Sequence, residues 1–243
     1  NRIETGEAKA TQGILELILP LIHDGNEEIA CHSKEIARKT MSESEFNDTQ
    51  RETKQIEENR DPLSFNSLFQ LAKMVEMKTG RLHHASEVPE LMSAIATRLD
   101  NPDIDPVLAR KAGLIYDVGF LEISDAIMKK KGSLTEEEFK IVKTHPIKGV
   151  VLMEYANLPL FFINAIKYHH ERLDGSGYPF GLKGDKIPLI AQIVAVVDFY
   201  NAIISPRPYK EQVSREMGIK ALKKAGGILL NSDIVEIIAD LAG

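Results

Sequence analysis

Only one cysteine, Cys31, occurs among the 243 residues of the sequence. A single thiol cannot form an internal disulfide, so the fold does not depend on a disulfide framework. Free thiols are typical of reducing compartments, and we therefore expect a cytoplasmic protein. With 43% hydrophobic residues, the chain can bury a sizeable core by packing alone.

Long apolar runs are also missing. The longest strongly apolar stretch near the start covers residues 14–22 and contains Glu16 and Pro20. A membrane-spanning helix needs about 20 consecutive apolar residues. The stretch also lacks the basic flank and small-residue cleavage site of a signal peptide. We expect neither a signal peptide nor a membrane segment in this chain.

Positive charge is in deficit, with a formal net charge of -6 and an isoelectric point near 5.7. Proteins that bind duplex nucleic acid normally have a basic patch and a high isoelectric point. The composition therefore argues against duplex nucleic acid as a partner. Any anionic ligand must be held by local positive groups.

Strand-like alternation of β-branched and polar residues is not found at convincing length. Apolar residues instead recur at helical spacing, as in residues 65–75 and 189–202. The sequence therefore predicts an all-α domain over residues 61–243. Residues 1–60 are expected to form an N-terminal helical extension or linker. For residues 26–60, an exposed connector is favoured over a dimerising or signal-transmitting helix.

Several histidines and aspartates lie at inward positions or at helix ends. His84 shares a stripe with Val88 and Ile95, and Asp198 lies on a small-residue face of an apolar helix. Buried polar groups of this kind are costly unless they are hydrogen-bonded or bind a metal ion. For His84 alone, a hydrogen-bonded core histidine is the simpler interpretation. The full set is His84, Asp117, His145, His169, His170 and Asp198.

Together these side chains favour a metal site. Imidazole and carboxylate ligands without thiolate are typical of iron, manganese or zinc hydrolytic sites rather than of structural zinc. If Asp117 bridged two ions, one ion could generate the nucleophile while both clamped the phosphoryl oxygens. We expect a divalent metal, iron or manganese with zinc as the alternative, bound as one or two ions.

A glycine-rich motif follows the paired histidines. It reads His-His-Glu at 169–171, Asp-Gly-Ser-Gly-Tyr-Pro at 174–179, Gly-Leu at 181–182 and Arg-Pro-Tyr at 207–209. This string resembles the HD-GYP family, a branch of the HD-domain metal phosphohydrolases associated with cleavage of cyclic di-GMP. The resemblance covers about residues 63–243. It implies an HD-domain helical bundle with a C-terminal Gly-Tyr-Pro loop.

The resemblance also implies roles for individual residues. Arg207 and Lys210 would approach the substrate phosphate and act in catalysis with Asp117. Gly177 and Tyr178 would belong to the loop that shapes the guanine nucleotide site. The metal ligands that it implies are Asp117, His145, His169 and His170 at a first position, and His84, Asp117 and Asp198 at a second.

Three of the departures from the family pattern bear directly on the metal and phosphate sites. Tyr116 stands where the family has a ligand histidine, Phe120 where it has a lysine near the phosphate, and Asn201 where it has an aspartate behind the ligands. The first metal position keeps all its ligands, whereas the second has lost an imidazole. A phenol is a poor replacement because its pKa near 10 disfavours the phenolate.

These departures leave three functional hypotheses, of which two are the principal ones. We favour a degenerate signalling module that binds metal and either cyclic di-GMP, a related guanine dinucleotide or a protein partner through the Gly-Tyr-Pro loop, with weak or lost hydrolysis. The alternative is an active metal-dependent cyclic di-GMP phosphodiesterase. The third is a structural scaffold without a ligand. A homodimer is compatible with each of them.

Overall fold

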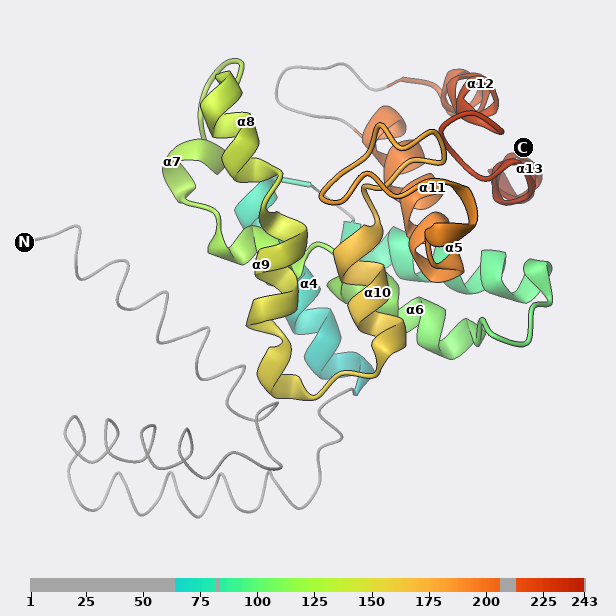
Figure 1. Cartoon of the computed structure of the whole chain (residues 1–243), viewed down its shortest axis with the longest axis horizontal. Helices are drawn as coiled ribbons and strands as arrows, with labels where there is room; N and C mark the ends of the chain where they lie inside the picture. Colours follow the sequence, from blue (N-terminus) through green and yellow to red (C-terminus); the bar gives the residue numbers. More distant parts are fainter. Residues whose placement is uncertain (1–63, 82–83, 206–212, 243) are drawn as a thin grey trace, which may run out of the picture. The chain divides into compact units, whose positions relative to one another are not determined.

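The computed structural model describes residues 64–81, 84–205 and 213–242 (Figure 1). The chain divides into two compact units. The first comprises Asn1–Ser67 with Tyr155–Asn157 and lies mostly outside the described residues, as does the predicted extension over residues 1–60. The second unit, Leu68–Glu154 and Leu158–Gly243, contains the helices that build the site.

The described residues form α-helices and short 3-10 turns, with no strand among them, which confirms the predicted all-α fold. None of the helices in this described part is long and apolar enough to cross a membrane. The elements are α4 (Phe65–Thr79), α5 (His84–Leu99), α6 (Pro106–Ile115), η2 (Val118–Glu122), α7 (Asp125–Met128), α8 (Glu136–Val142), α9 (His145–Leu152), η3 (Glu154–Ala156), α10 (Leu160–Tyr168), η4 (Gly184–Lys186), α11 (Leu189–Ile204), α12 (Arg215–Ala225) and α13 (Ser232–Ala242).

Local sequence signals fix where several helices begin. The side chain of Asp105 accepts hydrogen bonds from the backbone N–H groups of Val107 and Leu108, each at 2.8 Å, and so caps α6. Thr135 and Glu138 form a capping box at the start of α8. These caps satisfy backbone donors that a helix start would otherwise leave without partners.

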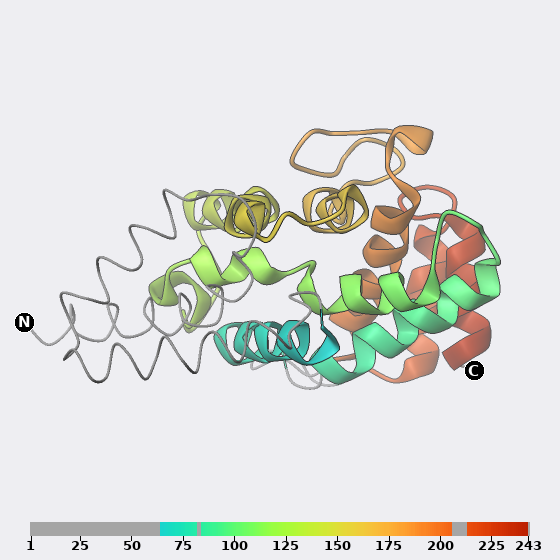
Figure 2. The same ribbon diagram turned by 90° about the horizontal axis from the view of Figure 1, so that it is seen from below.

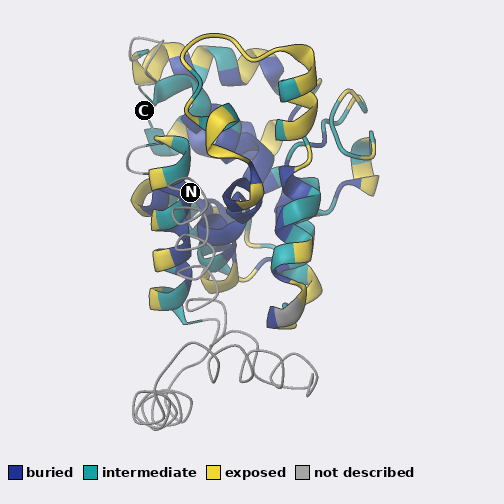
Figure 3. Ribbon diagram, turned by 90° about the vertical axis from the view of Figure 1, so that its left-hand side faces the viewer, coloured by how far each residue is buried: buried dark blue, intermediate teal, exposed yellow. Residues whose placement is uncertain are grey.

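Helix α11 lies at the centre of the hydrophobic core. It contacts α5, α10, α12 and α13, and ten of its sixteen residues are buried. Each fully buried Ile or Val contributes about 1.5–3 kcal/mol through the hydrophobic effect. Buried residues line the inner faces of the helices, and exposed residues lie on their outer faces (Figure 3). Asp198 is therefore held on a firmly packed helix.

A close backbone approach joins η2 to α9. A Cβ atom added at Gly119 would lie 1.9 Å from the carbonyl oxygen of His145, so only glycine fits there. Gly149 of α9 faces the same contact, with Gly119 N 3.1 Å from its virtual Cβ. Figure 2 shows η2 between α4 on one side and the α9–α10 pair on the other. This packing brings Asp117, just before η2, beside the first residue of α9.

Candidate metal centre

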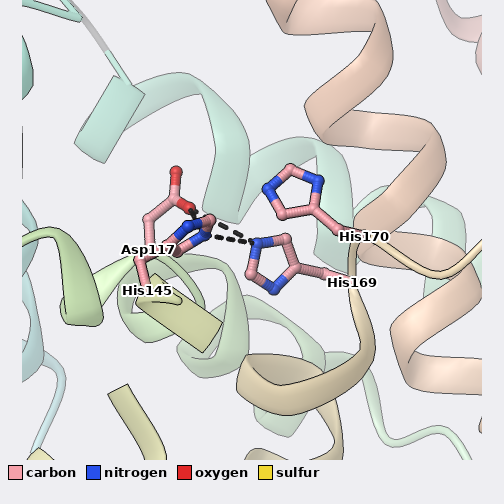
Figure 4. Close-up of side chains that lie close together, drawn as sticks. All are labelled: Asp117, His145, His169 and His170. Atoms are coloured by element: carbon pink, nitrogen blue, oxygen red, sulfur yellow. Dashed lines mark hydrogen bonds and ion pairs between the residues drawn. The ribbon is translucent and has the colours of Figure 1, made fainter. Parts of the chain in front are cut away.

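Four side chains from three chain segments converge on one point (Figure 4). Asp117 lies between α6 and η2, His145 is the first residue of α9, and His169 and His170 follow the last turn of α10. The ligand atoms that they offer all lie within 4.8 Å of one another. The structure thus brings together the four residues of the first metal position predicted from the sequence.

The tautomers of two histidines are set by the backbone. Nδ1 of His145 lies 2.9 Å from the carbonyl oxygen of Val142, and Nδ1 of His169 lies 2.9 Å from that of Ile166. A carbonyl only accepts, so each ring donates from Nδ1 and, when neutral, has a lone pair on Nε2. The two Nε2 atoms are 3.1 Å apart. Two lone pairs at this distance repel each other unless a cation lies beside both.

Asp117 completes this arrangement. Its Oδ1 lies 3.4 Å from Nε2 of His145 and 3.5 Å from Nε2 of His169. Oδ1 is a buried side-chain oxygen without a hydrogen-bond partner among the described residues. Buried polar atoms in native proteins are almost always satisfied. One oxygen and two nitrogen lone pairs facing one point fit a divalent metal ion of the iron, manganese or zinc type.

The protonation states agree with metal binding. Burial lowers the pKa of His145, and burial together with the neighbouring imidazoles lowers that of His170 well below its usual value. Neutral imidazole is the form that binds a metal. Burial opposes ionisation of Asp117, but the positive charge of Arg81 holds the pKa of this carboxyl well below its usual value. The carboxylate is therefore charged at neutral pH.

The residues of the second predicted position lie next to the first. Nε2 of His84 is 3.6 Å from Oδ2 of Asp117. The hydroxyl of Tyr116 donates to Oδ1 of Asp198 at 3.2 Å and is buried. Burial and the carboxylates of Asp117 and Asp198 raise the pKa of Tyr116 well above its usual value. The phenol therefore stays protonated and occupies one oxygen of Asp198.

Asn201 affects the tautomer of His84. The hydroxyl of Ser205 donates to Oδ1 of Asn201 at 2.8 Å, and Nδ2 of Asn201 faces Nδ1 of His84 at 3.4 Å. An amide nitrogen only donates, so in this orientation Nδ1 of His84 accepts and the ring proton lies on Nε2. Nε2 is the atom that faces Asp117. An aspartate at position 201 would accept from Nδ1 and leave the Nε2 lone pair for a metal.

Arg81 is a site residue that the sequence analysis missed. Its Nη1 donates to Oδ2 of Asp117 at 2.5 Å and to Oδ1 of Asp198 at 3.4 Å. Burial acts to lower the pKa of Arg81, but these two carboxylates outweigh it and raise the pKa. Two features of the sequence could have indicated it. Arg81 directly follows Gly80, which comes after the last residue of α4 and has φ +69°, and it lies three residues before His84, a candidate ligand.

Phe120 packs over His145, one of the candidate metal ligands. Its ring stacks on His145 with the ring centroids 4.0 Å apart and the planes 12° from parallel. The guanidinium of Arg81 lies 5.2 Å from the centroid of the same ring, within the range of a cation–π contact. Phe120, at the position where the family pattern has a lysine, therefore packs an apolar ring against His145. The guanidinium of Arg81 lies over the same ring.

The Gly-Tyr-Pro loop is fixed by Glu171, which is 1% exposed. Its two oxygens accept from the backbone N–H groups of Phe180 at 2.8 Å and Leu182 at 2.9 Å. A Cβ added at Gly177 would lie 2.4 Å from Cα of Glu171, so the loop approaches too closely for any other residue. Tyr178 then stacks on His170, with ring centroids 4.6 Å apart. The loop thus lies directly beside His170, one of the candidate metal ligands.

Arg207 and Lys210 lie outside the described residues, as does the Arg-Pro-Tyr part of the motif. Their predicted phosphate contacts stay predictions. Within the described part, Lys143 lies near the loop, with Nζ 5.8 Å from the ring centroid of Tyr178.

This fold, with its candidate metal site, defines a helical domain of the HD type. A family model described as "HD domain" matches residues 70–230, more than half of the chain. The chain therefore belongs to the HD-domain family, and its motif places it in the HD-GYP branch. A solved structure of an HDG"Y"P protein from Bdellovibrio bacteriovorus shares the fold, with a TM-score of 0.50, 19% identity and coverage of 74% of this chain and 65% of that one.

Curated relatives point to the same branch. A cyclic di-GMP phosphodiesterase of Pseudomonas aeruginosa is 36% identical over 67% of this chain and 39% of its own length. A cyclic di-GMP phosphodiesterase of Thermotoga maritima is 35% identical over 72% of this chain and 47% of its own length. A 3'3'-cGAMP-specific phosphodiesterase of Vibrio cholerae is 34% identical over 52% of this chain and 28% of its own. The chain thus spans less than half the length of these relatives.

Proposed function

We propose that this chain is a degenerate HD-GYP signalling module that holds one divalent metal ion, binds a cyclic guanine dinucleotide and hydrolyses it slowly or not at all. The contrast between the two predicted metal positions carries the proposal. At the first, a bare carboxylate oxygen of Asp117 faces two imidazole lone pairs. At the second, Asp198 is hydrogen-bonded to the phenol of Tyr116.

We propose iron or manganese for the first position, with zinc as the alternative, because its donors are three imidazoles and a carboxylate. A bound ion would supply Lewis-acid stabilisation of a phosphoryl oxygen. The protein orients the ligands through the Val142 and Ile166 carbonyls, which hold both Nε2 atoms toward the ion. With the second position altered, no second ion would share the charge that develops on the phosphate.

The ligand class is supported by the relatives, which are named as phosphodiesterases of cyclic di-GMP and 3'3'-cGAMP. Tyr178, held on His170 by the loop, offers an aromatic face within the Gly-Tyr-Pro motif. Arg207 and Lys210 are the residues that we propose for the phosphates, since charge-assisted hydrogen bonds are strong for this purpose. We propose that the protein binds such a ligand in the cytoplasm.

An active phosphodiesterase is the second candidate. One observation favours it, because all four ligands of the first position have the geometry of a metal site. A protein partner bound through the Gly-Tyr-Pro loop is a further role for the module, supported by Phe180, which is 53% exposed on that loop.

The test compares binding and turnover on one preparation loaded with manganese or ferrous iron. Calorimetry should show binding of cyclic di-GMP, and chromatography of the same mixture should show little linear or mononucleotide product. Binding should weaken in an Arg207→Ala, Lys210→Ala double variant, by about 1.5–3 kcal/mol for each charge-assisted hydrogen bond that the substitutions remove. Hydrolysis at an ordinary enzyme rate of about 10 per second would establish the active phosphodiesterase instead.

A further inference from the structure

Arg81 lies where its charge acts on both aspartates of the second metal position. A single nitrogen, Nη1, contacts Oδ2 of Asp117 at 2.5 Å and Oδ1 of Asp198 at 3.4 Å. The two carboxylates are 4% and 9% exposed, whereas the arginine side chain is 23% exposed. Buried carboxylates need a compensating cation, and the less deeply buried arginine supplies one.

The oxygens that Arg81 binds are the ones that a second ion would use. Oδ1 of Asp117 faces the first position, and Oδ2, on the opposite side of the carboxylate, faces His84 and Arg81. Oδ1 of Asp198 accepts from both Arg81 and Tyr116. A dication at this point would have to displace these donors and would be repelled by the guanidinium.

The ring of Phe120 helps to keep the guanidinium there. It lies 5.2 Å from Cζ of Arg81 and itself stacks on His145. Arginine suits such a contact because its planar guanidinium packs on aromatic faces and stays charged. Of the described residues, none is hydrogen-bonded to Nε or Nη2 of Arg81, and the guanidinium holds the two aspartates through Nη1 alone.

We propose that the guanidinium of Arg81 is the second cation of this site: it neutralises Asp117 and Asp198 in place of a second metal ion, and it excludes that ion. The inference rests on the proposed function, because it takes the first position as the metal site. The second metal position is therefore altered in two ways, by Tyr116 in place of a ligand histidine and by the charge of Arg81. Restoring ligands alone does not restore a second metal while Arg81 is present.

The test uses two variants that differ only at position 81. Both have Tyr116→His and Asn201→Asp, which return the imidazole and free Nε2 of His84. One retains Arg81, and the other has Arg81→Gln, which removes the charge and keeps much of the side-chain length. After loading with manganese and desalting, elemental analysis should find one equivalent with Arg81 and two with Arg81→Gln. Manganese calorimetry should show the additional binding event in the second variant alone.

Two results would overturn the inference: two equivalents while Arg81 is present, or one equivalent in both variants. If Arg81→Gln does not fold, Arg81→Ala prepared with methylguanidinium replaces it. With methylguanidinium present, the variant should bind one equivalent of manganese, and after its removal two. The same number of equivalents with and without methylguanidinium contradicts the proposal. Rapid hydrolysis or absent nucleotide binding by the unaltered chain would contradict the proposed function, yet leave this difference between variants intact.

Discussion

The Nε2 atoms of His145 and His169 lie 3.1 Å apart although each ring donates its Nδ1 proton to a backbone carbonyl. Both nitrogens therefore direct lone pairs at the same point, where Oδ1 of Asp117 is also unsatisfied within the described part of the chain. Without a cation these three atoms repel one another, whereas a cation at this point would be attracted by all three. Metal binding and stability should consequently be coupled.

We predict that His145→Gln abolishes metal binding at the first position, whereas His84→Gln leaves it intact. His145 is one of the four convergent ligands, while His84 lies 3.6 Å from the opposite oxygen of Asp117. An ion at a hundredfold excess over its dissociation constant should stabilise the unaltered fold by about 2.7 kcal/mol. For a domain of this size the melting temperature should rise by roughly 5–10 °C.

Thermal melts with and without manganese measure this effect in all three proteins. The rise should vanish in His145→Gln and persist in His84→Gln. If both substitutions abolish it equally, the ion is not held where the four ligands converge.

The stability of the chelator-treated protein should decrease as the pH falls below about 6.5. The pKa values of His84, His145 and His170 are lowered from 6.5, chiefly by burial. Below 6.5 the unfolded chain therefore binds protons that the folded chain does not, which favours unfolding. Each histidine contributes a slope of at most about 1.4 kcal/mol per pH unit. The pKa of Asp117 is also lowered, so its contribution is lost only in stronger acid.

Urea unfolding at a series of pH values measures this dependence. His145→Gln should have a shallower slope than the unaltered chain because one buried histidine is gone. A free energy of unfolding that stays constant between about pH 7.5 and pH 5 would contradict the assignment of these histidines as neutral.

Glu171→Gln should loosen the Gly-Tyr-Pro loop. Both carboxylate oxygens accept backbone N–H groups, from Phe180 and Leu182, and a glutamine can accept only one of them. The other N–H would face an amide that also donates, at a cost of about 1–3 kcal/mol. Hydrogen exchange at the amides of residues 180 and 182 should accelerate. The control Asp174→Asn alters an exposed carboxylate on the same loop, bonded to Ser176, and should change these two amides little.

Much of the site could be predicted from local sequence signals. The His-His pair after an apolar stripe predicted ligands at the end of α10, and the structure places both beside Asp117 and His145. The capping box of α8 likewise has a local signature, a threonine followed three residues later by a glutamate, at Thr135 and Glu138. These features depend on residues a few positions apart, whose spacing determines which face they share.

The contacts that change the second position could not be predicted in this way. Arg81 is 36 residues from Asp117 and 117 from Asp198, and it lies in a turn without periodicity. Tyr116 was recognised as a missing imidazole, but its hydrogen bond to Asp198, 82 residues away, depends on tertiary packing, in which α5 and α10 each contact both α6 and α11. Such partners are set by tertiary packing, on which the local pattern carries no information.

A set of four substitutions should restore hydrolysis. Tyr116→His and Asn201→Asp rebuild the second ligand set, Phe120→Lys returns a phosphate-binding cation, and Arg81→Gln vacates the ion's position. We expect cyclic di-GMP turnover to increase by roughly a hundredfold, or about 3 kcal/mol of transition-state stabilisation. The same set with Arg81 retained is the control and should gain much less, because groups that act as a unit are not additive. Equal gains with and without Arg81 would show that the arginine does not limit turnover.

The most direct measurement is an anomalous diffraction map of the unaltered protein crystallised with manganese. Our account predicts one peak per chain, bonded to Asp117, His145, His169 and His170, with the guanidinium of Arg81 between Asp117 and Asp198. Two peaks bridged by Asp117, with Arg81 displaced from both carboxylates, would contradict it.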